Sequence, residues 1–351
     1  MKIQIDSVTF LKELHERSGW YFKNQPNGRY GNRNLYIKAI ILFMLLCTCW
    51  WLLYVVTPNI IIAIFIAILF GATKAGIGFN VMHDALHGSF SKKRWLNKVL
   101  GYSLDLLGGD SKIWKWQHNQ NHHVHTNVMG QDHDIDVGKL GRFSPEQPWH
   151  WWHKYQYVYV WFLYGISYLA WIFWLDYGKA KKMGWNKENY NKTFLLFLKK
   201  LFINNAIFLF VPLYLCKPFY DYVLLTYLVT EITCGLITSC IFQLAHVVED
   251  TAMLPQSDQV VRYDAIWQLQ STADFGTQNK VLFWYLGGLN FQVEHHLGFT
   301  VSHIHYPAVH TILQSLCAKY DLRLLEYKNL HQATLSHIRQ LKKLGRKPEL
   351  L

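Results

Sequence analysis

Cysteine is scarce in this sequence, and its few copies form no recognisable pattern. There are 6 cysteines in 351 residues, and no two of them have CxxC spacing. We therefore expect neither a cysteine metal site nor a disulfide framework. Most of them fall in apolar runs, where cysteine acts as a small buried hydrophobic residue. The six are Cys47, Cys49, Cys216, Cys234, Cys240 and Cys317.

Charged residues are also few, and acidic ones are the fewest. Only 17% of the residues are charged, against 51% hydrophobic and 16% aromatic, and the mean hydropathy is +0.02. These values favour apolar spans joined to a polar body over an ordinary soluble enzyme. The 35 Lys and Arg residues outnumber the 23 Asp and Glu residues, leaving a net charge of +12. Such a chain suits anionic lipid headgroups, a phosphate-bearing substrate such as an acyl-CoA, or nucleic acid.

Signatures of several soluble functions are missing as well. The sequence contains no zinc-finger, helix-turn-helix or RNA-binding motif, so we do not expect nucleic acid as a partner. Residues 1–36 are polar and charged before the first apolar stretch begins, so we expect no cleavable signal peptide. The first span would then be retained as an anchor.

Long apolar runs are what the sequence does have. One pair covers residues 37–56 and 60–79 and a second covers 201–216 and 222–244, each pair joined by a short turn. Runs of this length can cross the ~30 Å hydrocarbon core of a bilayer. We predict an all-α integral membrane protein of one domain, residues 1–351. It would have four transmembrane helices in two hairpins, 37–80 and 201–244.

The distribution of basic residues predicts the orientation of these hairpins. Residues 1–36 and the region 81–200 both carry many lysines and arginines, whereas the two hairpin tips are nearly uncharged. By the positive-inside rule, both basic regions lie on the cytoplasmic side, together with a helical cap formed by residues 245–351. Residues 149–174 could form a fifth span. Because tryptophan and tyrosine cluster at one end, we favour a helix lying in the membrane interface.

Histidines occur in clusters that could bind a metal. His83 and His87 follow the second apolar run at helical spacing, so both rings can reach one metal. His118 and His122 repeat this spacing and His123 adds a neighbour. On an α-helix His123 points about 100° away from His122, so one segment could serve two metals.

Two further histidine sites lie downstream. His295 and His296 form an adjacent pair, with Gln292 three residues before the first of them. His246 stands at the cytoplasmic end of the fourth span, where an ionisable residue needs a partner. His125 and His133 fall off the pattern and are expected to be polar residues at the surface or beside the site.

Taken in order, these clusters resemble the membrane fatty-acid desaturase family, whose signature is HxxxH, then HxxxHH or HxxHH, then HxxHH or QxxHH. The variant with glutamine is similar to front-end or linoleoyl-CoA-type acyl desaturases, and we expect this protein to be of the kind that lacks a fused haem-binding cytochrome domain. Gly298-Phe299-Thr300 departs from the Phe-Pro that usually follows the last pair. The resemblance implies two irons, with Gln292 where relatives often have histidine. The implied ligands are His83, His87, His118, His122, His123, His246, His295 and His296.

The resemblance also implies the chemistry. A diferrous centre would bind O₂, abstract two vicinal hydrogens from an acyl-CoA or acyl lipid and release water. Electrons would come from a separate ferredoxin or cytochrome-type carrier with its reductase. Polar neighbours could hydrogen-bond the ligand rings or act as weak ligands. These neighbours are Asp84, Asn119, Gln243, Gln292 and Glu294.

Two other functions are compatible with the same residues. A lipid hydroxylase or ketolase would share the scaffold, and its product would carry oxygen without a new double bond. A zinc-binding membrane protein or metal transporter would also use histidines. Its ligands should lie at mid-membrane depth, whereas these histidines flank the ends of the spans.

Overall fold

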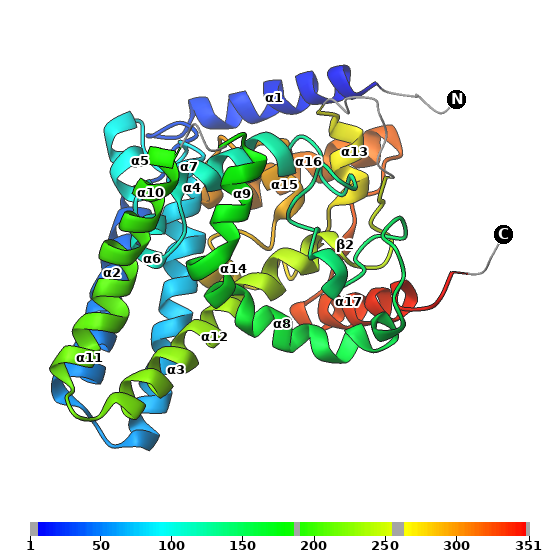
Figure 1. Cartoon of the computed structure of the whole chain (residues 1–351). Helices are drawn as coiled ribbons and strands as arrows, with labels where there is room; N and C mark the ends of the chain where they lie inside the picture. The colour runs from blue at the N-terminus through cyan, green and yellow to red at the C-terminus, as the bar shows by residue number, and fades with distance from the viewer. Residues whose placement is uncertain (1–5, 186–189, 255–262, 349–351) are drawn as a thin grey trace.

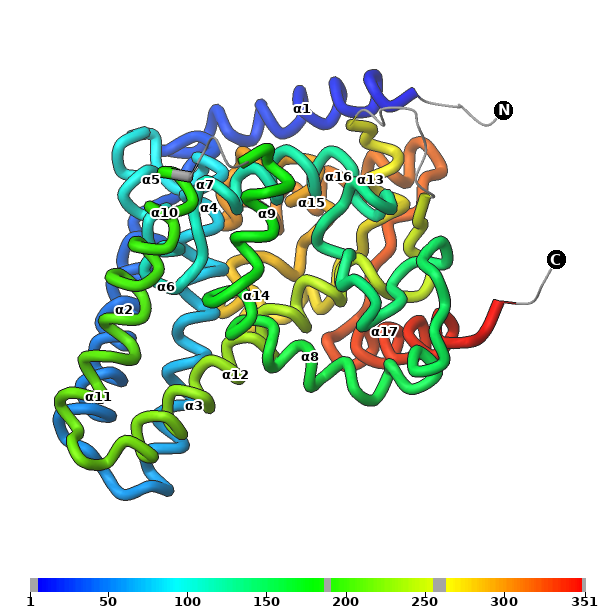
Figure 2. The backbone as a smooth tube through the Cα atoms, in the orientation of Figure 1, coloured from blue at the N-terminus to red at the C-terminus, as the bar shows by residue number. Residues whose placement is uncertain are grey.

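The computed structural model describes residues 6–185, 190–254 and 263–348, and nearly all regular structure there is helical. Figure 1 shows a stalk of long helices that extends from a broader cap. In the tube view of Figure 2, the same helices run side by side toward the tip of the stalk. The stalk comprises α2 (Arg33–Trp51), η1 (Leu52–Val56), α3 (Ile60–Ile77), η8 (Lys200–Phe210), α11 (Val211–Leu215) and α12 (Tyr220–His246).

The stalk helices begin with polar caps and then expose apolar side chains. The side chains of Asn32 and Asn59 accept hydrogen bonds from the first-turn N–H groups of α2 and α3, which are otherwise unpaired at a helix start. Ile61 and Phe65 on α3 are 66% and 67% exposed. An exposed apolar surface of this kind is stable against lipid rather than water.

Within the described residues, five helices are long and apolar enough to cross a membrane, one more than the sequence predicted. Four of them coincide with the two predicted hairpins. The fifth, Trp151–Lys182, covers the segment expected in the interface. The second helix of the first hairpin continues past the predicted end at residue 80, and the first helix of the second hairpin begins before the predicted start at residue 201. Polar residues end the apolar run in the sequence, but they do not end the helix. The five are Arg33–Val56, Ile60–Leu86, Trp151–Lys182, Asn191–Leu215 and Tyr220–His246.

The cap contains the remaining elements and one departure from an all-helical fold. β1 (Asp274–Phe275) and β2 (Glu326–Tyr327) pair in parallel, with Asp274 opposite Glu326. The strands are only two residues long, too short to produce a strand pattern in the sequence. The cap helices are α1 (Ser7–Lys23), α4 (His83–Leu86), α5 (Arg94–Gly101), α6 (Ser103–Leu107), α7 (Ser111–Trp114), η3 (Lys115–His122), η4 (Gly138–Leu140), η5 (Trp151–Tyr155), α8 (Gln156–Ala170), η6 (Trp171–Leu175), α9 (Asp176–Lys182), α10 (Tyr190–Lys199), α13 (Ala265–Ser271), α14 (Lys280–Leu286), α15 (Gln292–Leu297), η9 (His303–His305), α16 (Tyr306–Tyr320) and α17 (Leu330–Leu344).

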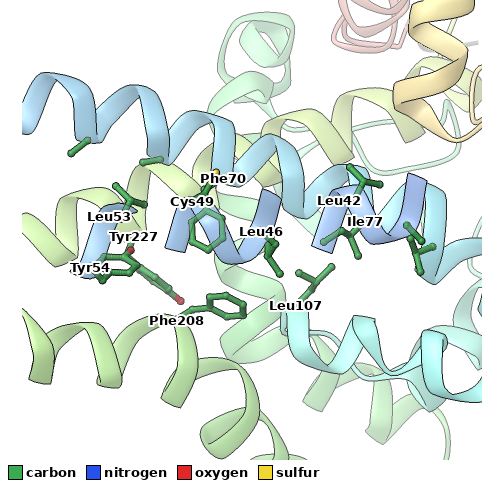
Figure 3. Packing of buried hydrophobic residues seen from close by; sticks show 14 of the residues in the cluster. Leu42, Leu46, Cys49, Leu53, Tyr54, Phe70, Ile77, Leu107, Phe208 and Tyr227 are labelled. Carbon is green, nitrogen blue, oxygen red and sulfur yellow. The ribbon is translucent and has the colours of Figure 1, made fainter. Parts of the chain in front are cut away.

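A large apolar core holds the stalk together and connects it to the cap. Figure 3 shows Leu46, Phe70, Phe208 and Tyr227, from four different segments, in this core. Cys49 is buried among them, and all six cysteines are free thiols, as the sequence predicted. Because α3 and α12 share this core, the histidines that follow them are held in one place.

Candidate metal centre

The first pair of predicted ligands lies where a long helix changes its winding. α3 continues through a π-helical turn, η2 (Gly78–Met82), into α4. His83 and His87 then stand one turn apart, with ring centroids separated by 4.6 Å, and both are buried. π-turns of this kind are frequent at functional sites. Both rings therefore point into the cap rather than toward lipid.

The second histidine segment is π-helical, whereas the sequence interpretation assumed an α-helix. The N–H of His123 donates to the carbonyl oxygen of His118, five residues earlier, at 3.1 Å. The ring centroid of His123 lies 4.6 Å from that of His118 and 5.7 Å from that of His122. All three rings are buried, because the wider winding keeps residues four and five positions apart on one face.

The remaining histidines come from α15 and from the end of α12. His295 and His296 are adjacent and fully buried, and their ring planes are 83° apart. The rings consequently face different neighbours. His246 ends α12, and its ring centroid lies 4.7 Å from that of His122 and 4.9 Å from that of His296.

The structure brings the eight predicted ligands together as two neighbouring groups. His83, His87, His118 and His295 form one group, and His122, His246 and His296 form the other. Within each group the ligand atoms all lie within 4.8 Å of one another. His123 lies between the groups, with its ring centroid 4.5 Å from that of His295 and 4.6 Å from that of His296. Among the described residues, His125 and His133 belong to neither group and are half-buried.

The chemistry of these rings fits a metal. Buried polar atoms are normally hydrogen-bonded, yet several ring nitrogens here have no hydrogen-bond partner within the described residues. These are both nitrogens of His87, His123 and His246, and Nε2 of His295 and His296. Burial also lowers the pKa of His118, His123, His295 and His296 well below 6.5. Neutral imidazoles with free lone pairs are the form that binds metal ions.

Hydrogen bonds orient three of the ligand rings. Nδ1 of His122 lies 3.1 Å from both carboxylate oxygens of Asp132. Although burial opposes it, the carboxylates of Asp132 and Asp134 raise the pKa of His122 to about 9. Nδ1 of His295 lies 3.0 Å from the Tyr306 hydroxyl. Partners at the second nitrogen fix which ring nitrogen is free for a metal.

The third oriented ring is that of His296. Its Nδ1 lies 2.9 Å from Oε1 of Gln268 and 3.1 Å from the hydroxyl of Thr126. Sequence reasoning singled out none of the residues that orient these rings. The sequence offered one signal for these residues, which is the alternating aspartates after the second cluster, Asp132, Asp134 and Asp136. Gln268 and Tyr306 stand in unremarkable sequence.

The polar neighbours named from the sequence form hydrogen bonds elsewhere. Oδ2 of Asp84 accepts from Ser302 Oγ at 2.7 Å and lies 3.0 Å from Nδ1 of His303. It therefore ties α4 to the chain after α15. The role of these polar neighbours beside a metal stays a prediction. The other contacts join Asn119 to the Leu86 carbonyl, Gln243 to the Asp134 carbonyl, Gln292 to the Leu289 carbonyl and Glu294 to His310.

A further buried group supports the third cluster. Nδ1 of His310 lies 2.8 Å from Glu294 and 3.5 Å from Asp274. Although burial opposes it, these two carboxylates raise the pKa of His310 to about 10. The ligand atoms of the three residues also lie within 4.8 Å of one another. An imidazolium between two carboxylates anchors α15, which carries His295 and His296.

A basic cavity opens beside the first histidine group. It has a volume of about 590 Å³, and His87 is part of its lining. Of the described residues that line it, none is acidic. The cationic residues are Arg29, Lys92, Arg94, Lys98, Lys112 and Lys115.

Phe299 stacks on His123 with ring centroids 4.9 Å apart, and its ring centroid lies 5.6 Å from that of His87. The residues that depart from the usual Phe-Pro therefore still place an aromatic ring over the histidines.

An apolar pocket lies beside the last turns of α12. It has a volume of about 340 Å³ and lies among α8, α12, α14 and α17. Ile241 and Leu244, which line it, are close in sequence to His246. A cationic space thus borders the first histidine group, and an apolar space lies along the helix that ends at His246.

Comparison with known proteins agrees with this arrangement. The chain is 31% identical to an sn-1 linoleoyl-lipid 6-desaturase of Arthrospira platensis, over 98% of this chain and 94% of the relative. It is 30% identical to the protein of the same name from Synechocystis, over 96% of each chain. An acyl-lipid (8-3)-desaturase of Physcomitrium patens is also 30% identical, over 97% of this chain and 72% of the relative.

The match to a family profile covers most of the chain. Residues 50–328 match the profile of the fatty acid desaturase family. This range includes all eight clustered histidines and every stalk helix except most of α2. It confirms the resemblance drawn from the three clusters and favours desaturation over a transporter function. The chain therefore belongs to the fatty acid desaturase family and is a membrane-embedded oxidoreductase that desaturates fatty acids.

Proposed function

We propose that this desaturase works with two irons held by the eight clustered histidines. The observation that carries the proposal is the pair of adjacent buried histidine groups, several of whose converging ring nitrogens have no hydrogen-bond partner within the described residues. Imidazole suits iron, copper and zinc alike. Reaction with O₂ requires a redox-active metal, which favours iron over zinc. His123, between the groups, would complete the coordination of one iron or the other.

The stoichiometry of the reaction requires a separate reductant. Removing two vicinal hydrogens from an acyl chain while reducing O₂ to two waters consumes two further electrons and two protons. When bound, the irons would supply the activation of O₂ and the removal of the hydrogens. Burial favours the neutral form of His118, His123, His295 and His296, and hydrogen bonds orient the rings of His122, His295 and His296. A small acidic carrier, a ferredoxin or cytochrome-type protein, would deliver the electrons to the basic face.

The two cavities support a placement for the substrate. The acyl chain would lie across the histidine groups, with its polar carrier near the basic cavity. Phosphate or another anionic group suits the cations there. The relatives' names describe acyl-lipid substrates, which supports a glycerolipid carrier over CoA. These names also support front-end placement of a cis double bond, since linoleoyl chains already carry double bonds beyond carbon 6.

The cap would face the cytoplasm, with four spans and α8 lying along the interface. Val158 and Phe162 on α8 are 60% and 68% exposed, and Trp151 just before it is 67% exposed. Figure 1 shows α8 passing along the underside of the cap and crossing α12, away from the bundle of α2, α3 and α11. An exposed apolar face beneath the cap is what an interfacial helix needs.

The test combines metal analysis with product analysis. We expect His122→Ala and His296→Ala to lose iron and to lose desaturase activity in a desaturase-deficient host. His331→Ala, which removes an exposed histidine, should change neither. Purified variants that kept full iron and activity would refute the metal assignment. A hydroxylated lipid without a new double bond, seen by mass spectrometry of the wild-type products, would favour a hydroxylase.

A further inference from the structure

A buried ion pair joins two long helices near the middle of their apolar lengths. Nζ of Lys74 on α3 lies 2.5 and 2.7 Å from the two carboxylate oxygens of Glu231 on α12. Their side chains are 0% and 1% exposed. Lys74 belongs to the candidate span Ile60–Leu86 and Glu231 to the candidate span Tyr220–His246. The pair is therefore shielded from water inside two helices that are long and apolar enough to span a bilayer.

Aromatic rings enclose the ammonium group on its other sides. Nζ of Lys74 lies 4.8 Å from the ring centroid of Phe208 in η8 and 5.2 Å from that of Tyr168 in α8. Lys74 thus contacts three elements besides its own helix. Charges placed at this depth are costly unless they are paired, and they generally serve a function. Apolar side chains would fill the same space without that cost, so simple packing does not account for the pair.

The contact surface around the pair brings the backbones of α3 and α12 close together at one glycine. Four small residues, Ala63, Ala67, Gly71 and Ala75, recur every fourth position on α3, and the three alanines are almost fully buried. A Cβ atom at Gly71 would lie 2.3 Å from the carbonyl oxygen of Thr230 on α12, so the two backbones touch. Small residues permit such close helix packing in membranes. A slip of one turn, about 5.4 Å, would place an alanine of the stripe where Gly71 now meets this carbonyl, so the close approach at Gly71 and the ion pair favour the same register.

The ion pair adds an electrostatic preference for this same register. Lys74 is the charged partner available to Glu231 in the observed register, and a slip of one turn would separate the two groups in an apolar surrounding. This register matters at the histidines. α3 continues directly through η2 to His83 and His87, whereas α12 ends at His246. These residues belong to different histidine groups.

We propose that Lys74 and Glu231 are positioning residues that set the axial register of α3 against α12. Through this register they set the spacing between the two histidine groups. The inference rests on the proposed metal function, because its effect is read at the metals. Neither residue touches the histidines, so their effect would pass through the helices.

The key test removes both charges together. Replacing a buried ion pair with apolar residues is often close to neutral for stability, so Lys74→Met with Glu231→Leu should give a folded, monodisperse protein in detergent. We expect this variant to bind less iron and to show broadened or additional iron sites in its Mössbauer spectrum. Its activity should fall about a hundredfold, as a displacement of 1 Å at a reacting centre can cause.

The charge-swapped double variant, Lys74→Glu with Glu231→Lys, tests whether pairing itself is responsible. It should recover most of the iron content and the sharp wild-type spectrum. The single variant Glu231→Gln, which leaves a buried ammonium unpaired, should lose both. A folded apolar variant with wild-type iron content, spectrum and activity would overturn the proposal. If the wild-type protein itself bound no iron, the metal function would fail, independently of the register.

Discussion

Asp132 faces Nδ1 of His122 with both carboxylate oxygens at 3.1 Å. Both side chains are buried, with exposures of 0% and 1%. The arrangement turns Nε2 of His122 toward the group that also contains His246 and His296. A carboxylate in this place makes the ring a better ligand and holds its orientation.

Asp132→Asn should therefore weaken metal binding at the second histidine group. The amide is similar in size but carries no charge, and removing such a partner typically costs about 10–100-fold in metal affinity or activity. Iron titration of the purified protein, together with turnover of an acyl substrate, would measure both effects. Asp136→Asn is the matched control, because Asp136 is nearby in sequence but exposed. Equal iron affinity in the two variants would contradict the role assigned to Asp132.

Tyr306→Phe should loosen one ring of the first histidine group. The Tyr306 hydroxyl lies 3.0 Å from Nδ1 of His295, and both residues are buried. Loss of this partner frees the ring to rotate and leaves its second nitrogen without a hydrogen bond. We expect turnover to fall about tenfold, on the scale of one lost orienting contact. The fold should be retained, as judged by the melting temperature.

Tyr320→Phe provides a comparison for this prediction. Tyr320 is on the same helix, but its hydroxyl bonds Glu13 rather than a histidine. If both variants lost activity equally, the effect would lie in the packing of α16 and not in the orientation of His295.

The histidine clusters were predictable because their spacing is local. Each local pair, such as His83 with His87 or His295 with His296, needs only a buried helix to bring its two rings to the metal centre. The assignment of His118 and His122 to different groups was not predictable, because it depends on which distant histidines each ring meets in the fold, and the π-helical winding of their segment was not predictable either. Winding of this kind depends on the tertiary surroundings rather than on residue type.

The supporting residues could not be found because they meet the histidines only in the folded chain. Gln268 reaches His296 from α13, and Thr126 reaches it across 170 positions of sequence. The ion pair in the stalk was not predictable for a similar reason. Lys74 lies within an apolar run whose average hydropathy conceals a single charge, and its partner Glu231 is 157 positions away.

Reversing charges in the basic cavity should weaken substrate binding more than catalysis. Lys98 and Lys112 both line this cavity and are exposed. If the cavity receives the anionic carrier of the acyl chain, Lys98→Glu with Lys112→Glu should raise KM about tenfold with little change in kcat. The difference in KM between the variant and the wild-type protein should shrink as salt is added, because exposed charges are screened.

The control for the cavity preserves the change in net charge. Lys328→Glu with Lys347→Glu reverses two exposed lysines that do not line the cavity. A similar rise in KM in this variant would show that overall charge, and not the cavity, attracts the substrate.

His337 should make the protein less stable in mild acid. It is fully buried, with Nδ1 2.6 Å from the Val247 carbonyl and Nε2 2.9 Å from the Tyr164 hydroxyl. Burial lowers the pKa of His337 from 6.5 to about 4. Between these values the unfolded chain binds a proton that the folded chain does not, so the free energy of unfolding falls as the pH drops below 6.5. The loss at pH 5 would be on the order of 2 kcal/mol.

His337→Gln should remove this part of the acid sensitivity, because the amide can replace both hydrogen bonds and does not titrate. Melting temperatures in detergent at pH 7 and pH 5 would show it: the wild-type protein should lose more stability between these values than the variant. Other buried histidines add to the acid response of both proteins, so the difference between the two slopes isolates His337. His331→Gln, at an exposed position, should keep the wild-type slope. If His337→Gln also kept the wild-type slope, the prediction would be wrong, because His337 would then be protonated in the folded protein at pH 5.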